Sequence, residues 1–174
     1  REKGLVYKLN FGVELPRIKA IAGEYEKDHS LAQALWKEDI RECKILATLI
    51  MSPEEMDETL AKQWIVDINS QDLAEMACFN LFQHLHHAAD LSYQLMKSNR
   101  EIEQMCGYLI LSRLFMNGEN PHGNRINEFM DEVALALNSE NMGIRHAALN
   151  CVNKFAELGE DFRNMAEERL NLQL

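Results

Sequence analysis

The amino-acid sequence predicts an all-α fold of stacked helical hairpins, organised as one domain over residues 1–174. The chain contains only 8 Gly and 3 Pro, which are too few turn residues for a β-sandwich or barrel of this length. Hydrophobic residues make up 47% of the chain, enough to bury a sizeable core. Apolar segments with helical spacing recur at intervals of roughly 30–40 residues, as helical-hairpin repeats do. An ordinary helical bundle with short loops would give a similar spacing and stays an alternative.

The first third of the chain predicts three helices. Residues 1–13 are irregular, and Pro16 then suits the first turn of a helix that we expect to end near Asp28–His29. A short helix follows, with its inward side formed by Leu31, Leu35 and Trp36. We expect Asp39 to cap the third helix, which covers residues 40–51.

The middle third opens on a strong helix-start signal, Ser52-Pro53-Glu54-Glu55, and we expect that helix to run to about Asp67. Ser70 is a good N-cap for the next helix, because its hydroxyl accepts from an unpaired backbone N–H. Asp72 lies in the first turn, where the helix dipole favours a carboxylate. We expect this helix to reach about Leu85, and a further helix to cover residues 86–97.

The last third predicts four helices and one clear loop. The most apolar helix covers 101–116, and Asn117–Pro121 forms the loop. Helices are expected at about 125–137, 142–158 and 161–170. The more apolar, inner helices of the hairpins begin near Ile40, Leu73, Ile102 and Ile144, and each contains one cysteine: Cys43, Cys78, Cys106 or Cys151.

Charge and cysteine usage exclude several functional classes. The net charge is −10, and residues 51–96 hold eight carboxylates against one basic residue, Lys62. This balance argues against strong non-specific DNA binding, which depends on a basic stripe. The cysteines form no Cys-x-x-Cys pair, so we expect no metal site, reduced structural thiols and a cytoplasmic location. There is no spanning segment and no Gly-rich phosphate loop, so we expect no membrane association and no cofactor.

Three groups of polar residues are candidates for chemistry. Asp72 and Glu75 lie near one face of a helix, either as a capped acidic turn or as a carboxylate at the edge of a pocket. His84 and His87 share a face, which suits either a metal ion or a polar helix end. Four basic residues on inner helices either contact phosphates or form solvated faces paired with Glu42 or Glu157: Arg41, Lys44, Arg145 and Lys154.

Two segments resemble the DNA alkylation repair enzymes of the AlkD type. They are Phe11-Gly12-Val13 with Leu15-Pro16-x-Ile18-Lys19-x-Ile21-Ala22, and Leu35-Trp36 with Ile40-Arg41-Glu42-x-Lys44-Ile45-Leu46-Ala47. The resemblance covers about residues 11–155. It implies HEAT-like repeats in a curved, right-handed solenoid with a concave groove. It also implies the activity of the family's active members, which are glycosylases. They excise positively charged alkylated purines with a carboxylate that is flanked by tryptophans.

The resemblance can be carried over residue by residue. The catalytic helix of the family reads approximately Ser-Trp-Asp-x-x-Asp, which Ser70 and Asp72 match. Gln71 stands in place of the tryptophan and Glu75 in place of the catalytic aspartate. Arg145 falls where the family tends to keep a basic residue. Two further positions align near an arginine and a tryptophan of the family, and here they are Gln104 and Leu149.

These replacements predict a degenerate active site. We expect a non-catalytic member that binds a protein or a nucleic acid in its concave groove, as a monomer, with Lys154 and the other basic residues as groove candidates. The alternative is an active alkylpurine glycosylase that uses Glu75, with Asp72 beside it, on duplex DNA. Active relatives have further N-terminal helices, so we also expect that the chain lacks its natural ones.

Overall fold

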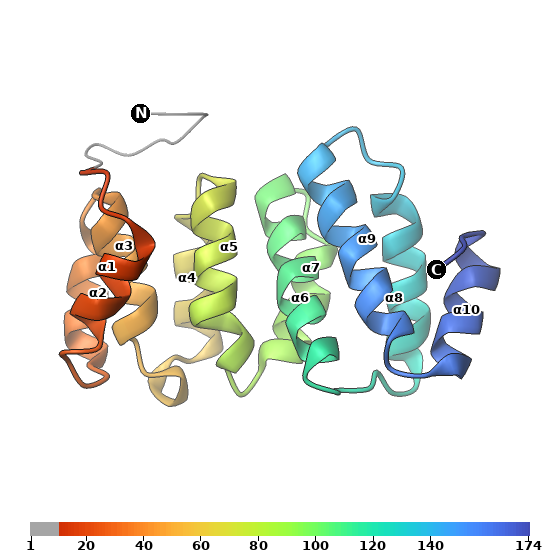
Figure 1. Ribbon diagram of the computed structural model, residues 1–174, viewed down its shortest axis with the longest axis horizontal. Coiled ribbons are helices and arrows are strands. Elements are labelled where there is room, and N and C mark those ends of the chain that lie inside the picture. Colours follow the sequence, from red (N-terminus) through yellow and green to blue (C-terminus); the bar gives the residue numbers. More distant parts are fainter. Residues whose placement is uncertain (1–10) are drawn as a thin grey trace. The chain divides into compact units, whose positions relative to one another are not determined.

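The computed structural model describes residues 11–174, and every regular element in that range is helical (Figure 1). These residues contain ten α-helices and two short 3₁₀ turns. They divide into two compact units, unit 1 up to His87 and unit 2 from Ala88 to Leu174, which are described separately below. The predicted all-α class is confirmed, whereas most of the irregular segment predicted for 1–13 lies outside the described residues.

Unit 1 is organised around one central helix. Helices α1, α2 and α5 each pack against α3, where Ile45 and Ala47 are fully buried. The elements of unit 1 are α1 (Leu15–Ala22), α2 (His29–Lys37), α3 (Arg41–Ile50), η1 (Pro53–Glu55), α4 (Glu58–Val66), α5 (Gln71–Asn80) and η2 (Phe82–His84).

Two helix boundaries near the start of unit 1 differ from the prediction. Helix α1 ends at Ala22, well before Asp28–His29, because Gly23 closes it and Asp28 instead begins α2. The Asp28 carboxylate accepts a hydrogen bond from the backbone N–H of Leu31 at 2.9 Å. Asp39 lies one position too early to cap α3, whose N-cap is Ile40 without a side-chain hydrogen bond.

The start signal at Ser52 produces only a 3₁₀ turn, not the predicted helix from residue 53 to 67. The chain is extended at Met56, whose side chain is 2% exposed, and α4 begins only afterwards. Asp57 is the N-cap of α4, and its carboxylate accepts from Leu60 N at 2.8 Å. Burial of Met56 therefore overrides a local signal that would otherwise continue the helix.

Helix α5 is capped as predicted but is shorter than predicted. The Ser70 hydroxyl accepts from the backbone N–H of Leu73 at 3.2 Å. The helix ends at Asn80 rather than near Leu85, because Leu81 leaves the helical region with φ −130°. Leu81 and Phe82 are both fully buried, so packing of these two side chains ends the helix.

In unit 2, α7 packs against α6 and α9, and α8 and α10 also pack against α9. A cluster of aromatic rings from α7, α8, α9 and the start of α10 fills this core, with ring centroids 5.1 to 5.7 Å apart. The elements are α6 (Ala88–Met96), α7 (Glu101–Met116), α8 (Asn124–Ala136), α9 (Met142–Ala156) and α10 (Glu160–Leu170). The bounds predicted for α7 are confirmed.

The four cysteines lie where the inner-helix prediction placed them, on α3, α5, α7 and α9. Cys43 is half-buried and the other three are buried. They form no disulfide within the described range. Helices α3, α5, α7 and α9 are therefore called the inner helices below.

Candidate nucleic-acid interface

One face of α5 presents three side chains at four-residue intervals: Gln71, Glu75 and Phe79. All three are exposed, and Phe79 retains 48% of its accessible surface. The Gln71 amide donates a hydrogen bond to the Glu75 carboxylate, Nε2 to Oε1 at 3.0 Å. Glu75 is thus presented to solvent with an amide partner, not held in a dry pocket.

Asp72 points to a different partner from Glu75. Its Oδ2 accepts from Nε of Arg41 on α3 at 3.1 Å. The same guanidinium donates to the carbonyl of Val13 at 3.4 Å, and its side chain is only 15% exposed. The structure therefore brings Arg41 and Asp72 together as a tie between α3, α5 and the segment before α1.

Lys44 is a buried structural cation. Its ammonium donates to the backbone carbonyl of Trp36 at 2.6 Å and lies 4.5 Å from the centroid of that indole. Burial lowers the pKa of Lys44, an effect opposed by the charges of Asp67 and Asp39. The ammonium faces the protein interior, so this geometry does not support the predicted phosphate contact.

The chain's two tryptophans stack on each other. The indole rings of Trp36 on α2 and Trp64 on α4 are 4.3 Å apart and nearly parallel, at 1°. Each is 3% exposed, and Trp36 Nε1 donates to Asp67 at 3.0 Å. Neither indole is therefore presented on the exposed face of α5 beside Glu75.

The candidates of unit 2 make mostly local contacts. The Gln104 amide donates to the Ser98 carbonyl at 2.7 Å, and Arg145 donates to the Ser139 carbonyl at 3.1 Å. Lys154 is 3.5 Å from Glu157, one turn later on α9. Leu149 is 40% exposed on the same helix. Arg145 and Lys154 thus border an exposed stripe of α9 that carries no charged side chain, formed by Met142, His146, Leu149, Asn150 and Asn153.

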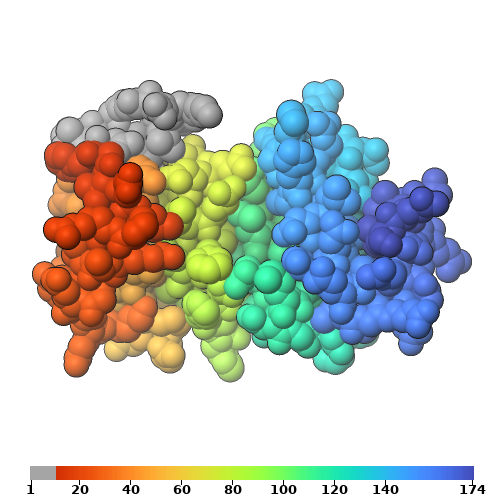
Figure 2. Space-filling view, in the orientation of Figure 1, coloured from red at the N-terminus to blue at the C-terminus, as the bar shows by residue number. Residues whose placement is uncertain are grey.

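Helix α1 carries two exposed basic residues, on different sides of the helix, that were not selected from the sequence. Arg17 and Lys19 are both exposed, and no carboxylate occurs within Leu15–Ala22. The ammonium of Lys19 lies 5.9 Å from the ring centroid of Phe79. Figure 2 shows the side chains of α1, in red, on the same face of unit 1 as those of α5, in yellow-green. The absence of acids from this helix was a signal available in the sequence.

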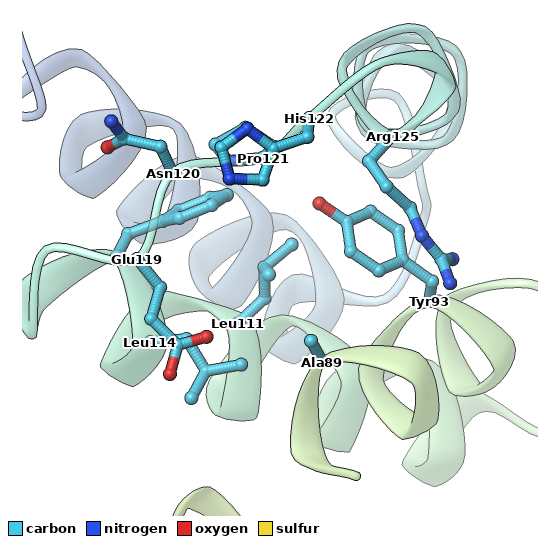
Figure 3. Close-up of a pocket in the computed structure, with 10 residues that line it drawn as sticks. Ala89, Tyr93, Leu111, Leu114, Glu119, Asn120, Pro121, His122 and Arg125 are labelled. Atoms are coloured by element: carbon cyan, nitrogen blue, oxygen red, sulfur yellow. The ribbon is translucent and has the colours of Figure 1, made fainter.

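Unit 2 contains a cavity of about 300 Å³ bordered by α6, α7, α8 and the loop between α7 and α8. In Figure 3 the Tyr93 hydroxyl points toward the loop that carries Pro121 and His122, and Arg125 runs along its ring. The Arg125 guanidinium carbon lies 4.5 Å from the Tyr93 centroid. The hydroxyl is buried without a hydrogen-bond partner in residues 11–174, and burial raises the pKa of Tyr93.

Residues 11–174 contain neither a metal-binding cluster of side chains nor a membrane-spanning helix. No three His, Cys, Asp or Glu side chains there come close enough to hold a metal ion, so His84 and His87 do not form such a group. No helix there is both long enough and apolar enough to cross a membrane.

Comparisons with known proteins identify the family and the fold of the chain. Residues 8–163 match the family model described as DNA alkylation repair enzyme. One similar solved structure is described as belonging to a new family of proteins related to the HEAT-like repeat DNA glycosylases with affinity for branched DNA structures. It has a TM-score of 0.83 and 19% identity, over 95% of this chain and 72% of that chain. No curated protein sequence matches. The fold is thus a HEAT-like helical repeat, and the chain belongs to the DNA alkylation repair enzyme family.

Proposed function

We propose that this protein is a non-catalytic member of its family that binds DNA, with branched DNA as its preferred form. The single observation that carries the loss of catalysis is the burial of Trp36 and Trp64 against each other. An aromatic wall beside the carboxylate would stabilise a cationic lesion through its π face. Here the residue that precedes Asp72 is Gln71, which offers no such face, and both indoles are used in packing.

Glu75 supports the same proposal. It is longer than aspartate by one methylene, and a displacement of about 1 Å can cost on the order of 10²-fold in rate. Its carboxylate is exposed and accepts from Gln71, so the charge is solvated instead of being preorganised in a water-excluded site. Such a carboxylate stabilises an oxocarbenium-like charge poorly, because water screens the interaction.

Charge favours a limited DNA contact over a long one. Residues 51–96 carry eight carboxylates and a single basic residue, so a long duplex along them would be repelled. Helix α1 is different, since Arg17 and Lys19 are exposed and unopposed within that helix. A branch point offers phosphates and unstacked bases within a short span and from more than one direction, which suits two exposed cations on different sides of one helix. The affinity for branched DNA described for the similar structure points the same way.

The proposal is tested by measuring binding of wild-type protein to a four-way junction and to a duplex of equal length, by fluorescence anisotropy at low salt. We expect tighter binding to the junction. Arg17→Gln with Lys19→Gln should weaken binding by about tenfold. The matched control, Lys37→Gln with Lys62→Gln, changes the same charge on the outer helices α2 and α4 and should have little effect.

A base-release assay on methylated DNA distinguishes the alternative, an active glycosylase that uses Glu75. We expect no release of 7-methylguanine or 3-methyladenine by the wild type. Release that disappears in Glu75→Gln but persists in Glu24→Gln, an exposed acid outside α5, would establish the glycosylase instead. Absence of binding to every DNA form at low salt would reject DNA as the partner and leave a protein ligand.

A further inference from the structure

Phe79 is an exposed aromatic residue on an inner helix. Its ring keeps 48% of its accessible surface, and it lies one turn after Glu75 on α5. The other phenylalanines of the helical core, such as Phe82, Phe115 and Phe155, are almost fully buried. A large apolar side chain on a face that otherwise carries Gln71 and Glu75 is suited to contact with a flat apolar surface.

A cation accompanies this ring. Lys19 Nζ from α1 lies 5.9 Å from the Phe79 centroid, at the outer limit of a cation–π contact. The interaction is weak at this distance, so the ammonium remains available to an anion. The ammonium lies over the ring, so a base stacks on Phe79 when the long lysine side chain swings aside toward the phosphate of that nucleotide. The pair then supplies a π face and a positive charge, the two features with which proteins hold single-stranded nucleic acid.

We propose that Phe79 and Lys19 form a stacking site for one unpaired nucleobase at a DNA branch point, with the base on the Phe79 ring and its phosphate near Lys19. This inference rests on the proposed DNA binding and adds the chemical group that the protein recognises. It also places the aromatic contact two turns beyond the position of Gln71, on the same exposed face of α5.

Glu75 completes the site. Its carboxylate stands one turn before Phe79, and carboxylates accept hydrogen bonds from exocyclic amino groups such as N4 of cytosine. A base with an amino group on its Watson–Crick edge, such as cytosine or adenine, is therefore favoured over thymine. Paired bases keep these edges occupied, so the site selects unpaired ones.

The test uses a three-way DNA junction with one unpaired cytosine at the branch, and the same junction with an abasic site at that position. Phe79→Leu, which keeps an apolar side chain without a π system, should weaken binding to the first junction about tenfold. It should leave binding to the abasic junction unchanged. Phe79→Trp should restore binding, and Tyr25→Leu, which removes an exposed aromatic outside α5, is the matched control with wild-type affinity.

Wild-type protein alone supplies a second readout, independent of how the variants fold. 2-Aminopurine at the unpaired position should be quenched on binding, and the abasic junction should bind about tenfold more weakly than the cytosine junction. Equal affinity of wild type for the two junctions, or an equal loss on both in Phe79→Leu, overturns the stacking site while DNA binding stands. Failure of the wild type to bind any junction instead overturns the proposed function, and this inference with it.

Discussion

Arg41 Nε on α3 lies 3.1 Å from Asp72 Oδ2 in the first turn of α5, so the two inner helices of unit 1 are joined by an ion pair. The Arg41 side chain is 15% exposed and that of Asp72 is 32% exposed. Partial burial makes this pair stronger than a surface ion pair, because water screens it less. The Arg41 guanidinium is therefore already engaged in an ion pair within the protein, and a phosphate group would have to compete with Asp72 for it.

The first prediction follows from this pair. A double-mutant cycle with Arg41→Met and Asp72→Asn should show a coupling energy of about 1 kcal/mol, measured by urea denaturation. The carboxylate and guanidinium are in contact, so each single change removes the same interaction. The stability losses of the two single variants should therefore add up to more than the loss in the double variant. A coupling energy of zero would mean that solvent fully screens the contact.

The second prediction concerns the tryptophan stack. Trp64→Ala should lower the free energy of unfolding by about 3–5 kcal/mol, because it opens a cavity against Trp36 in the core of unit 1. Urea denaturation followed by circular dichroism measures this loss. Val66→Ala on the same helix is the control, since Val66 is 60% exposed and should change stability by about 0.5 kcal/mol or less. Similar losses for the two variants would contradict the buried stack.

The third prediction concerns the close approach of α6 and α7 at Gly107. A Cβ at this position would lie 2.8 Å from the backbone nitrogen of Met96 and 2.8 Å from the carbonyl oxygen of Ser92. Gly107→Ala should therefore destabilise the protein by about 1–3 kcal/mol or more, although alanine is the better helix former. Thermal unfolding of the variants and the wild type measures this loss. Gly23→Ala is the control: its Cβ meets only ordinary contacts at 3.5 Å, so this variant should be neutral or slightly stabilising.

The fourth prediction concerns the buried Tyr93 hydroxyl, which has no partner in residues 11–174. Tyr93→Phe removes a desolvated polar group and keeps the ring under Arg125, so it should raise the free energy of unfolding by about 1 kcal/mol. Chemical denaturation of the two proteins side by side measures the difference. A loss of stability would show that the hydroxyl is hydrogen-bonded in solution.

The fifth prediction concerns pH. Burial raises the pKa of Cys151 to about 12, so the folded protein keeps this proton while the unfolded chain loses it above its ordinary pKa of about 8.5. The stability that the buried thiol contributes is complete below pH 8.5 and declines as pH rises toward 12. The free energy of unfolding should therefore fall between measurements at pH 8, 9 and 10. Cys151→Ala should make this decrease with pH smaller, although the variant is less stable than the wild type at pH 8. An unchanged slope in the variant would reject this assignment.

Much of the secondary structure could be predicted because its causes are local. A long apolar segment followed by the Asn117–Pro121 loop predicted α7 with its observed bounds, and the Ser70 hydroxyl caps α5 as its position indicated. The predicted helix boundaries were wrong around Met56 and Leu81, where burial of a side chain interrupts the helix. Burial depends on the neighbouring helices, so no local pattern could show it.

The sequence by itself determined the all-α repeat fold and the family, and it identified the α5 segment as the place where function should be sought. It grouped Asp72 with Glu75 because they are three residues apart on one helix. Only the tertiary structure decided that Asp72 turns to Arg41, that Lys44 and both tryptophans are buried, and that Lys19 meets Phe79. These contacts join helices far apart in the chain, and they are set by which faces pack together rather than by the spacing of residues along one helix.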